Sequence, residues 1–215
     1  AHTGFARQYL SFLSYVTKSK SPREVCLYFG SFNPLHRAHL QLARYALDHL
    51  PCDEVWLVLS PVNPLKSPAS QLPFSFRADY IRSAIEGEPR LRLVTLEAVL
   101  PLPHYTIRTL QALRLLHPDT TFSLFIGSDN LALLERWYDH SRLIASTSLH
   151  VYPRPGYDVS GEELAKLGGK ITFYPDAPQS TLSATELREA VLIGVDRSAD
   201  TAVPERWEEL CEQIT

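Results

Sequence analysis

Several features that would define a functional class at once are scarce or absent in this 215-residue chain. Only three cysteines occur, Cys26, Cys52 and Cys211, and this odd number without metal-type spacing favours a protein of the reducing cytoplasm. The longest apolar run near a predicted strand, 55–59, is far shorter than the ~20 residues that cross a bilayer, so no transmembrane helix is expected. Residues 1–22 contain no signal-peptide core, and we therefore predict no membrane partner.

A surplus of positive charge is also missing. Lysines and arginines number 21 against 24 aspartates and glutamates, for a net charge of −3 and a pI near 6.3. This balance argues against a sequence-independent nucleic-acid binder, so no nucleic-acid partner is expected. Neither the G-x-x-x-x-G-K-[ST] P-loop nor the G-x-G-x-x-G dinucleotide fingerprint occurs. Any affinity for phosphate must therefore be local.

What the chain does contain is a strand, a turn and two histidines within residues 25–40, VCLYFGSFNPLHRAHL. The apolar run 25–29 predicts a buried strand that ends at the turn-forming Gly30 and Ser31. Pro34 suits the first turn of a following helix, where a missing N–H costs nothing.

In such a helix, His36 and His39 share one face beside free N–H groups and the positive end of the helix dipole. That arrangement favours binding of an anion. The imidazole rings add hydrogen-bond donors and can become protonated beside a phosphate. A structural interpretation stays open: His36 caps a turn, and His39 is half-buried on a helix with Leu40 and Ala43 in the core.

Apolar runs alternate with helical patterns along the rest of the chain. We expect strands at 55–59, 91–96, 121–126, 148–152 and 170–174, and helices at 74–86, 106–117, 141–145, 160–167 and 185–193. Thr106 is expected to cap its helix, and Gly194 to end the last one. The alternation predicts an α/β fold with a Rossmann-like, doubly wound parallel sheet, helices on both faces, and ligands at the carboxyl ends of the strands.

We expect residues 23–215 to form a single domain. Residues 1–22 place apolar side chains at helical spacing, which predicts an N-terminal helical extension. That helix would cover the sheet edge or pack on another subunit, so a homo-oligomer stays open.

A second candidate anion site lies at residues 182–188, LSATELR. Ser183 and Glu186 form a capping-box pattern, which is a structural feature of many helix starts. The same helix start also offers hydroxyls, N–H groups and the Arg188 guanidinium, which together could hold a second phosphate.

Two of these segments resemble the signatures of the nucleotidyltransferase superfamily. GSFNPLHRAH resembles G-x-F-x-P-x-H-x-x-H, and LSATELR resembles I-S-[SA]-T-x-[IL]-R, about 145 residues later and in the same order. In that superfamily the histidines contact the phosphates of ATP, and the serine, threonine and arginine hold its β- and γ-phosphates. The resemblance implies an ATP site made of Gly30, Ser31, Phe32, His36, His39, Ser183, Thr185 and Arg188.

The segments between these signatures resemble bacterial nicotinate-nucleotide adenylyltransferases. IGSDNLALLERWYDHSRLI (126–144) is similar to their G-x-D-x-L…W-Y segment, VYPRPGY (151–157) to R-P-G-Y, PHYTIRTL (103–110) to S-Y-T-x-x-T-L, and NPLK (63–66) to P-P-H-[KR]. The resemblance implies that Trp137 stacks on the pyridine ring, while the N–H groups of Thr106 and Tyr138 receive the nicotinate carboxylate. Gly127 and Asp129 would line the adenosine side, and Asn33, Lys66 and Arg154 would contact the mononucleotide.

Each of these residues also has a structural alternative. Trp137 and Tyr138 could be core aromatics, Asp129 a helix cap, Lys66 a solvated lysine and Arg154 a rigid turn residue.

The implied reaction is adenylyl transfer from ATP to nicotinate mononucleotide, with His36, His39, Lys66 and Arg188 as the catalytic residues. Magnesium is expected to arrive with ATP, because the signature loops contain no carboxylate cluster for a resident metal. Leu65 stands where the family has histidine. Two alternatives stay open: an adenylyltransferase for nicotinamide mononucleotide or phosphopantetheine, and a nucleotide-binding regulator without turnover, which Leu65 favours.

Overall fold

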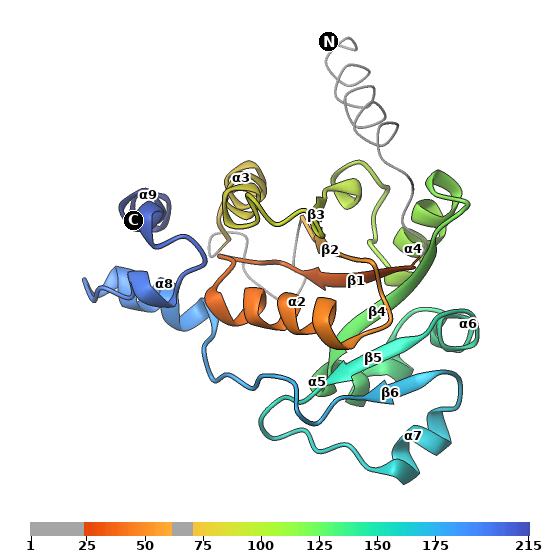
Figure 1. The fold of residues 1–215 in the computed structure, drawn as a ribbon. Coiled ribbons are helices and arrows are strands. Elements are labelled where there is room, and N and C mark those ends of the chain that lie inside the picture. The colour runs from red at the N-terminus through yellow and green to blue at the C-terminus, as the bar shows by residue number, and fades with distance from the viewer. Residues whose placement is uncertain (1–23, 62–70) are drawn as a thin grey trace.

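The computed structural model of the chain describes residues 24–61 and 71–215. Its centre is one six-stranded sheet in the order β3-β2-β1-β4-β5-β6, and all five strand pairs are parallel (Figure 1). The strands are β1 (Glu24–Gly30), β2 (Glu54–Leu59), β3 (Leu91–Val94), β4 (Thr121–Gly127), β5 (Leu149–Tyr152) and β6 (Ile171–Phe173). The predicted extension 1–22 lies outside the described residues, as does the segment that contains Leu65 and Lys66.

Helices follow the strands in the predicted alternation. They are α2 (Arg37–His49), α3 (Phe74–Ala84), α4 (Thr106–Leu116), α5 (Ser128–Ala132), α6 (His140–Ser146), α7 (Gly161–Leu167), α8 (Ala184–Leu192) and α9 (Trp207–Ile214). Short 3-10 turns are η2 (Leu96–Ala98), η3 (Leu134–Arg136), η4 (Ser198–Asp200) and η5 (Pro204–Arg206). None of the helices that the structure describes is long and apolar enough to cross a bilayer.

The sheet is buried on both faces, as a doubly wound fold requires. Successive side chains of a strand point to opposite faces, so Cys26 and Tyr28 pack into one core and Val25 and Leu27 into the other. The first core includes apolar side chains of α2, α3 and α9, and the second includes those of α4 and α6. The predicted Rossmann-like α/β fold with helices on both faces is confirmed.

The strand order reverses between β1 and β4, which creates a crevice at the carboxyl ends of these strands. In Figure 1, α8 lies beside the start of α2, so the end of the chain returns to the edge at which β1 finishes. The topology therefore brings the two signature segments together.

Three local predictions about element ends were wrong. Strand β3 ends at Val94, and Leu96 already begins the 3-10 turn η2. Thr106 is the first residue of α4 and does not cap it, because Tyr105 occupies the cap position. Pro34 precedes α2, which begins only at Arg37, and the Asn33–Pro34 peptide bond is cis.

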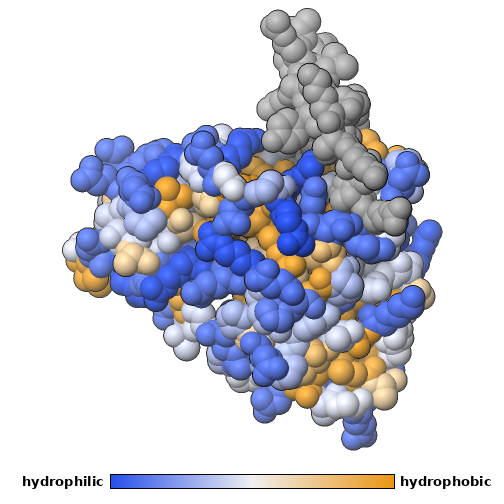
Figure 2. All heavy atoms as spheres, in the orientation of Figure 1, coloured by the Kyte–Doolittle hydropathy of each residue, from blue (hydrophilic) through white to orange (hydrophobic). Residues whose placement is uncertain are grey.

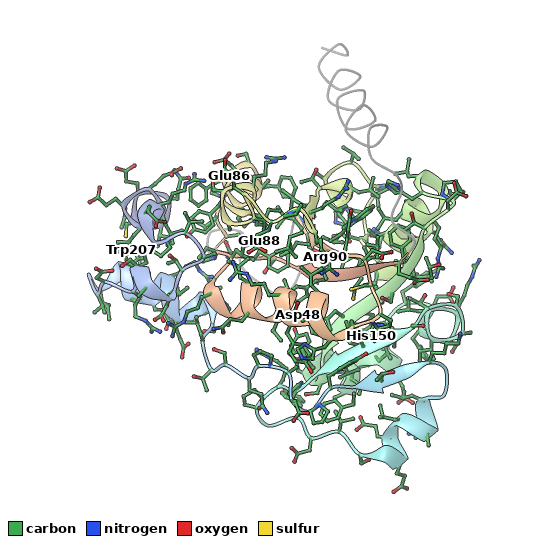
Figure 3. All side chains as sticks on the ribbon, viewed as in Figure 1. Asp48, Glu86, Glu88, Arg90, His150 and Trp207 are labelled. Carbon is green, nitrogen blue, oxygen red and sulfur yellow. The ribbon has the colours of Figure 1, made fainter. Side chains whose placement is uncertain are left out.

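The face that carries α2 is largely hydrophilic (Figure 2). Arg44 of α2 donates to Glu88 at 2.8 and 2.5 Å, and Arg90 donates to the carbonyl of Leu47 at 3.2 Å, as can be followed from the labelled Glu88 and Arg90 in Figure 3. His150 of β5, also labelled there, is buried, and its Nδ1 lies 3.0 Å from the Tyr174 hydroxyl.

Candidate active site

The loop after β1 is shaped by close packing around Phe32. A Cβ at Gly30 would lie 2.7 Å from Phe32 Cε1, so a larger residue at position 30 would displace this ring. Phe32 has a positive φ of 39° and is buried, and its ring packs edge-on against Tyr28 and His39 at centroid distances of 5.5 and 5.2 Å. Phe32 therefore packs against His39, while Gly30 provides the space for the Phe32 ring.

The two histidines meet at the first turn of α2. His36 occupies the N-cap, and the Nδ1 of His39 accepts a hydrogen bond of 3.1 Å from the His36 backbone N–H. The two rings stack with centroids 3.6 Å apart and an interplanar angle of 23°. Because Nδ1 of His39 is an acceptor, its Nε2 carries the hydrogen of the neutral ring and can donate to a ligand.

Both histidines are neutral at pH 7 in this structure. Burial, and to a lesser extent Arg154, lower the pKa of His36 to about 4, against a smaller opposing effect of Asp200. Burial, His36 and Arg154 together hold the pKa of His39 well below its usual value. The pair therefore offers hydrogen-bond donors, and the positive charge considered from the sequence is absent without an anion.

One nitrogen of this pair lacks a partner. His36 Nδ1 is buried and makes no hydrogen bond within the part of the chain that the structure describes. Buried polar atoms are nearly always satisfied in proteins, so an orphaned one indicates a ligand or ordered water at this position.

Arg188 of α8 joins the second signature to the first. Its Nη1 donates to the carbonyl oxygens of Asn33 and of Ala184, the latter at 3.0 Å, and its Nη2 donates to Thr185 Oγ1 at 3.2 Å. The guanidinium thus sits between α8 and the loop that precedes the histidines, where the resemblance places the ATP phosphates.

Ser183 is the N-cap of α8 and forms the predicted capping box with Glu186. Its Oγ accepts from the Glu186 backbone N–H at 3.2 Å and donates to the Glu186 carboxylate at 3.1 Å. The Glu186 carboxylate in turn accepts from the Ser183 N–H at 3.0 Å. The Ser183 hydroxyl is therefore already engaged within the helix start.

Asn33, which is expected to contact the mononucleotide, is buried in the loop that follows β1. Only 1% of the residue is exposed, and its Oδ1 accepts a 2.8 Å hydrogen bond from the Leu72 N–H. The buried side chain therefore holds Leu72, in the segment that follows β2.

The carboxyl ends of β4 and β5 bring Gly127, Asp129 and Arg154 together. A Cβ at Gly127 would collide with the Asp129 carboxylate and lie 2.8 Å from Arg154 Cγ. Arg154 Nε lies 3.9 Å from Asp129 Oδ2, and the Arg154 N–H donates to Ser128 Oγ at 2.8 Å. Asp129 lies in the first turn of α5 and does not cap it, and its buried Oδ1 is unpaired within the described residues.

The predicted pyridine pocket uses the starts of α4 and of the segment after η3. Trp137 is half-buried against the core, whereas Tyr138 is 51% exposed. Neither the Thr106 N–H nor the Tyr138 N–H donates a hydrogen bond to any residue that the structure describes. Two free backbone donors are thus available where the resemblance places the nicotinate carboxylate.

Arg77 of α3 is a contributor that was not identified from the sequence. This arginine is 2% exposed, and it donates to four carbonyl oxygens: Leu72 at 3.0 Å, Ser31 at 2.7 Å, Ser60 at 2.9 Å and Pro61 at 2.6 Å. It therefore ties the loop after β1 to the segment after β2. A detectable signal was its position on the helix face shared by the buried Tyr80 and Ile81, where a charged residue is unusual.

Comparison with known proteins identifies the family. The family model described as cytidylyltransferase-like matches residues 27–190, which is most of the chain. The chain belongs to the cytidylyltransferase-like family. Relatives named "Probable nicotinate-nucleotide adenylyltransferase" support this membership: one from Porphyromonas gingivalis is 42% identical over 83% of this chain and 89% of its own length, and one from Bacteroides fragilis is 39% identical over 79% and 83%.

Solved structures of cytidylyltransferase-like proteins share the fold. The Plasmodium falciparum nicotinic acid mononucleotide adenylyltransferase complexed with NaAD superposes with a TM-score of 0.70 and 21% identity, covering 81% of this chain and 86% of that one. The same enzyme complexed with APC gives a TM-score of 0.68 at 20% identity, covering 82% and 88%. At this level of identity the likeness concerns the fold alone.

Proposed function

We propose that the protein transfers the adenylyl group of ATP to nicotinate mononucleotide, giving nicotinate adenine dinucleotide and pyrophosphate, a late step of NAD biosynthesis. The observation that carries this proposal is the meeting of His36, His39 and Arg188 at the switch point between β1 and β4. The names of relatives at 33–42% identity support the same activity.

The reaction needs no protein nucleophile. A phosphate oxygen of the mononucleotide attacks the α-phosphorus of ATP, a new P–O bond forms, and the bond from that phosphorus to the oxygen bridging to the β-phosphorus breaks. Pyrophosphate leaves with that oxygen and its electron pair. Because the attacking phosphate is already ionised, catalysis consists of alignment and of stabilising charge on the phosphates.

The histidines and Arg188 act on opposite sides of the phosphate chain in this proposal. His36 and His39 donate to the reacting phosphates, and Arg188 with Thr185 holds the departing β- and γ-phosphates at the start of α8. Lys66, outside the described residues, would add positive charge near the mononucleotide phosphate. The N–H groups in the loop at Gly30, Ser31 and Phe32, together with Ser183, complete the proposed ATP site.

The nucleoside ends of the two substrates are assigned to residues at and after the end of β4 and to the start of α4. We assign the adenosine to Gly127 and Asp129, and the nicotinate ring to Trp137 and the free N–H groups of Thr106 and Tyr138. We assign Arg154, which lies beside Asp129, and Asn33, which also holds the Leu72 N–H, to the mononucleotide.

ATP would enter as its magnesium complex. Within the described residues, no cluster of three or more His, Cys, Asp or Glu side chains could hold a metal ion. Phosphate oxygens and water would therefore supply most ligands of the magnesium. All three cysteines are free thiols, which is compatible with the reducing cytoplasm in which we place this reaction.

Steady-state release of pyrophosphate tests the proposal. Purified protein with ATP and magnesium is given nicotinate mononucleotide, nicotinamide mononucleotide or phosphopantetheine in parallel, with the His39→Ala variant as the matched control. We expect release with nicotinate mononucleotide and a large loss in the variant. Faster turnover of another acceptor would assign the protein to that substrate, and no release with any acceptor would favour a nucleotide-binding regulator.

A further inference from the structure

Two tyrosines connect the segments that carry the free backbone donors of the pyridine pocket. The rings of Tyr105 and Tyr138 stack with centroids 4.3 Å apart and an interplanar angle of 13°. Tyr105 directly precedes Thr106, and Tyr138 carries the second donor on its own backbone. A side-chain contact therefore lies next to both N–H groups.

The stack and the contact of Arg108 with the Tyr138 ring connect the two segments through side chains. No backbone hydrogen bond joins residues 105–109 to residues 136–140 in the ranges that the structure describes. Ile107 and Trp137, from the same two segments, pack into one hydrophobic core cluster. The stacked rings therefore add a side-chain connection close to both donors.

A guanidinium covers the stack. The Arg108 Cζ lies 5.0 Å from the centroid of the Tyr105 ring and 5.3 Å from that of Tyr138, within the range of a cation–π interaction. Within the described part of the chain, Arg108 forms no ion pair with a carboxylate. Its positive charge is therefore not neutralised beside the two donors.

We infer that Tyr105, Tyr138 and Arg108 form a positioning cluster that sets the spacing of the Thr106 and Tyr138 N–H donors and selects a ring carboxylate over an amide. The inference rests on the proposed function. A carboxylate accepts from both donors at once and is attracted by the charge of Arg108, whereas an amide presents one oxygen and an NH₂ group that repels a donor. Misplacing one donor costs the carboxylate a hydrogen bond and costs the amide much less.

The test measures kcat and KM for nicotinate and nicotinamide mononucleotides, and KM for ATP, in Tyr105→Leu and Arg108→Gln. Since an aromatic pair contributes up to ~1.5 kcal/mol, we expect Tyr105→Leu to lower the acid-to-amide ratio of kcat/KM by roughly three- to tenfold, mainly through KM for the acid. Arg108→Gln should lower the same ratio and reduce its dependence on salt. KM for ATP should change less than twofold, because none of the residues assigned to ATP belongs to the cluster.

Conservative variants separate positioning from a simple loss of structure. Tyr105→Phe keeps the stacked ring and should retain the wild-type ratio, and the double variant Tyr105→Leu/Tyr138→Leu should lose no more than the worse single variant. Thermal unfolding of each variant shows whether the fold is intact. An unchanged ratio in Tyr105→Leu, or equal losses for acid and amide, would overturn the inference while leaving the proposed function in place. Failure of the wild-type protein to use either mononucleotide would overturn both.

Discussion

Replacing Arg77 with methionine removes the buried guanidinium while keeping a side chain of similar length. In the folded protein this guanidinium satisfies the carbonyls of Leu72, Ser31, Ser60 and Pro61. Methionine can fill the space, but it donates no hydrogen bond to any of them.

The expected change in the free energy of unfolding is the balance of two opposing contributions. A buried acceptor left unpaired costs ~1–3 kcal/mol, and the Leu72 carbonyl is in this class, whereas water can reach the other three in part. Against this, the variant no longer has to dehydrate a cation, a penalty that also lowers the pKa of Arg77. We therefore expect a net loss of ~2–4 kcal/mol in the free energy of unfolding.

Urea unfolding measures this loss, with Arg44→Met as the control. Arg44 forms an ion pair with Glu88, but its side chain is 52% exposed, so its replacement should cost less than ~1 kcal/mol. Arg77→Lys should recover only part of the stability, because one ammonium group cannot donate to all four carbonyls, which are arranged around the planar guanidinium of Arg77.

Activity should fall with the same substitution, since Ser31 lies between Gly30 and the histidines. Assayed at a temperature where the variant is folded, Arg77→Met should show a lower kcat together with the stability loss. A loss below ~1 kcal/mol with normal kcat would refute the reasoning that Arg77 organises the loop after β1.

Three further predictions concern the histidines and the pyridine pocket. His39→Ala should lower kcat by roughly a hundred- to a thousandfold, as for a lost donor to developing charge; a change below threefold in steady-state assays would make His39 structural. Trp137→Ala should weaken binding of the pyridine nucleotide by ~1–3 kcal/mol while leaving ATP binding nearly unchanged, as calorimetry can measure; equal losses for both, or a lower Tm, would identify a core residue. Because the pKa of His36 is about 4 in the folded state and about 6.5 when unfolded, the unfolded state binds more protons between these values, so stability should fall as pH drops from 6.5 to 4. Urea unfolding across this range should show a shallower pH dependence in His36→Gln, and an identical dependence would contradict the assignment.

The sequence by itself determined the class of fold and the position of the first signature along it. The apolar patterns of strands and helices follow from local backbone geometry. The alternation of strands and helices from residues 25–29 onward could therefore be predicted from the sequence. The turn at Gly30 and the three-residue spacing of His36 and His39 are equally local. The ends of the elements were harder to predict: α2 begins at Arg37, three residues after Pro34, because His36 with its extended backbone occupies the N-cap.

Only the tertiary structure decided which distant residues meet. Arg188 reaches the Asn33 carbonyl because the strand order brings α8 to the end of β1, and strand order has no periodic signature in the sequence. The Arg77 hydrogen bonds and the stacking of Tyr105 on Tyr138 arise in the same way, from segments that are far apart along the chain. The hydrogen bond from the Leu72 N–H to Asn33 Oδ1 is likewise a contact between two loops. Local periodicity specifies what a segment becomes, whereas packing of the whole sheet specifies what each segment touches.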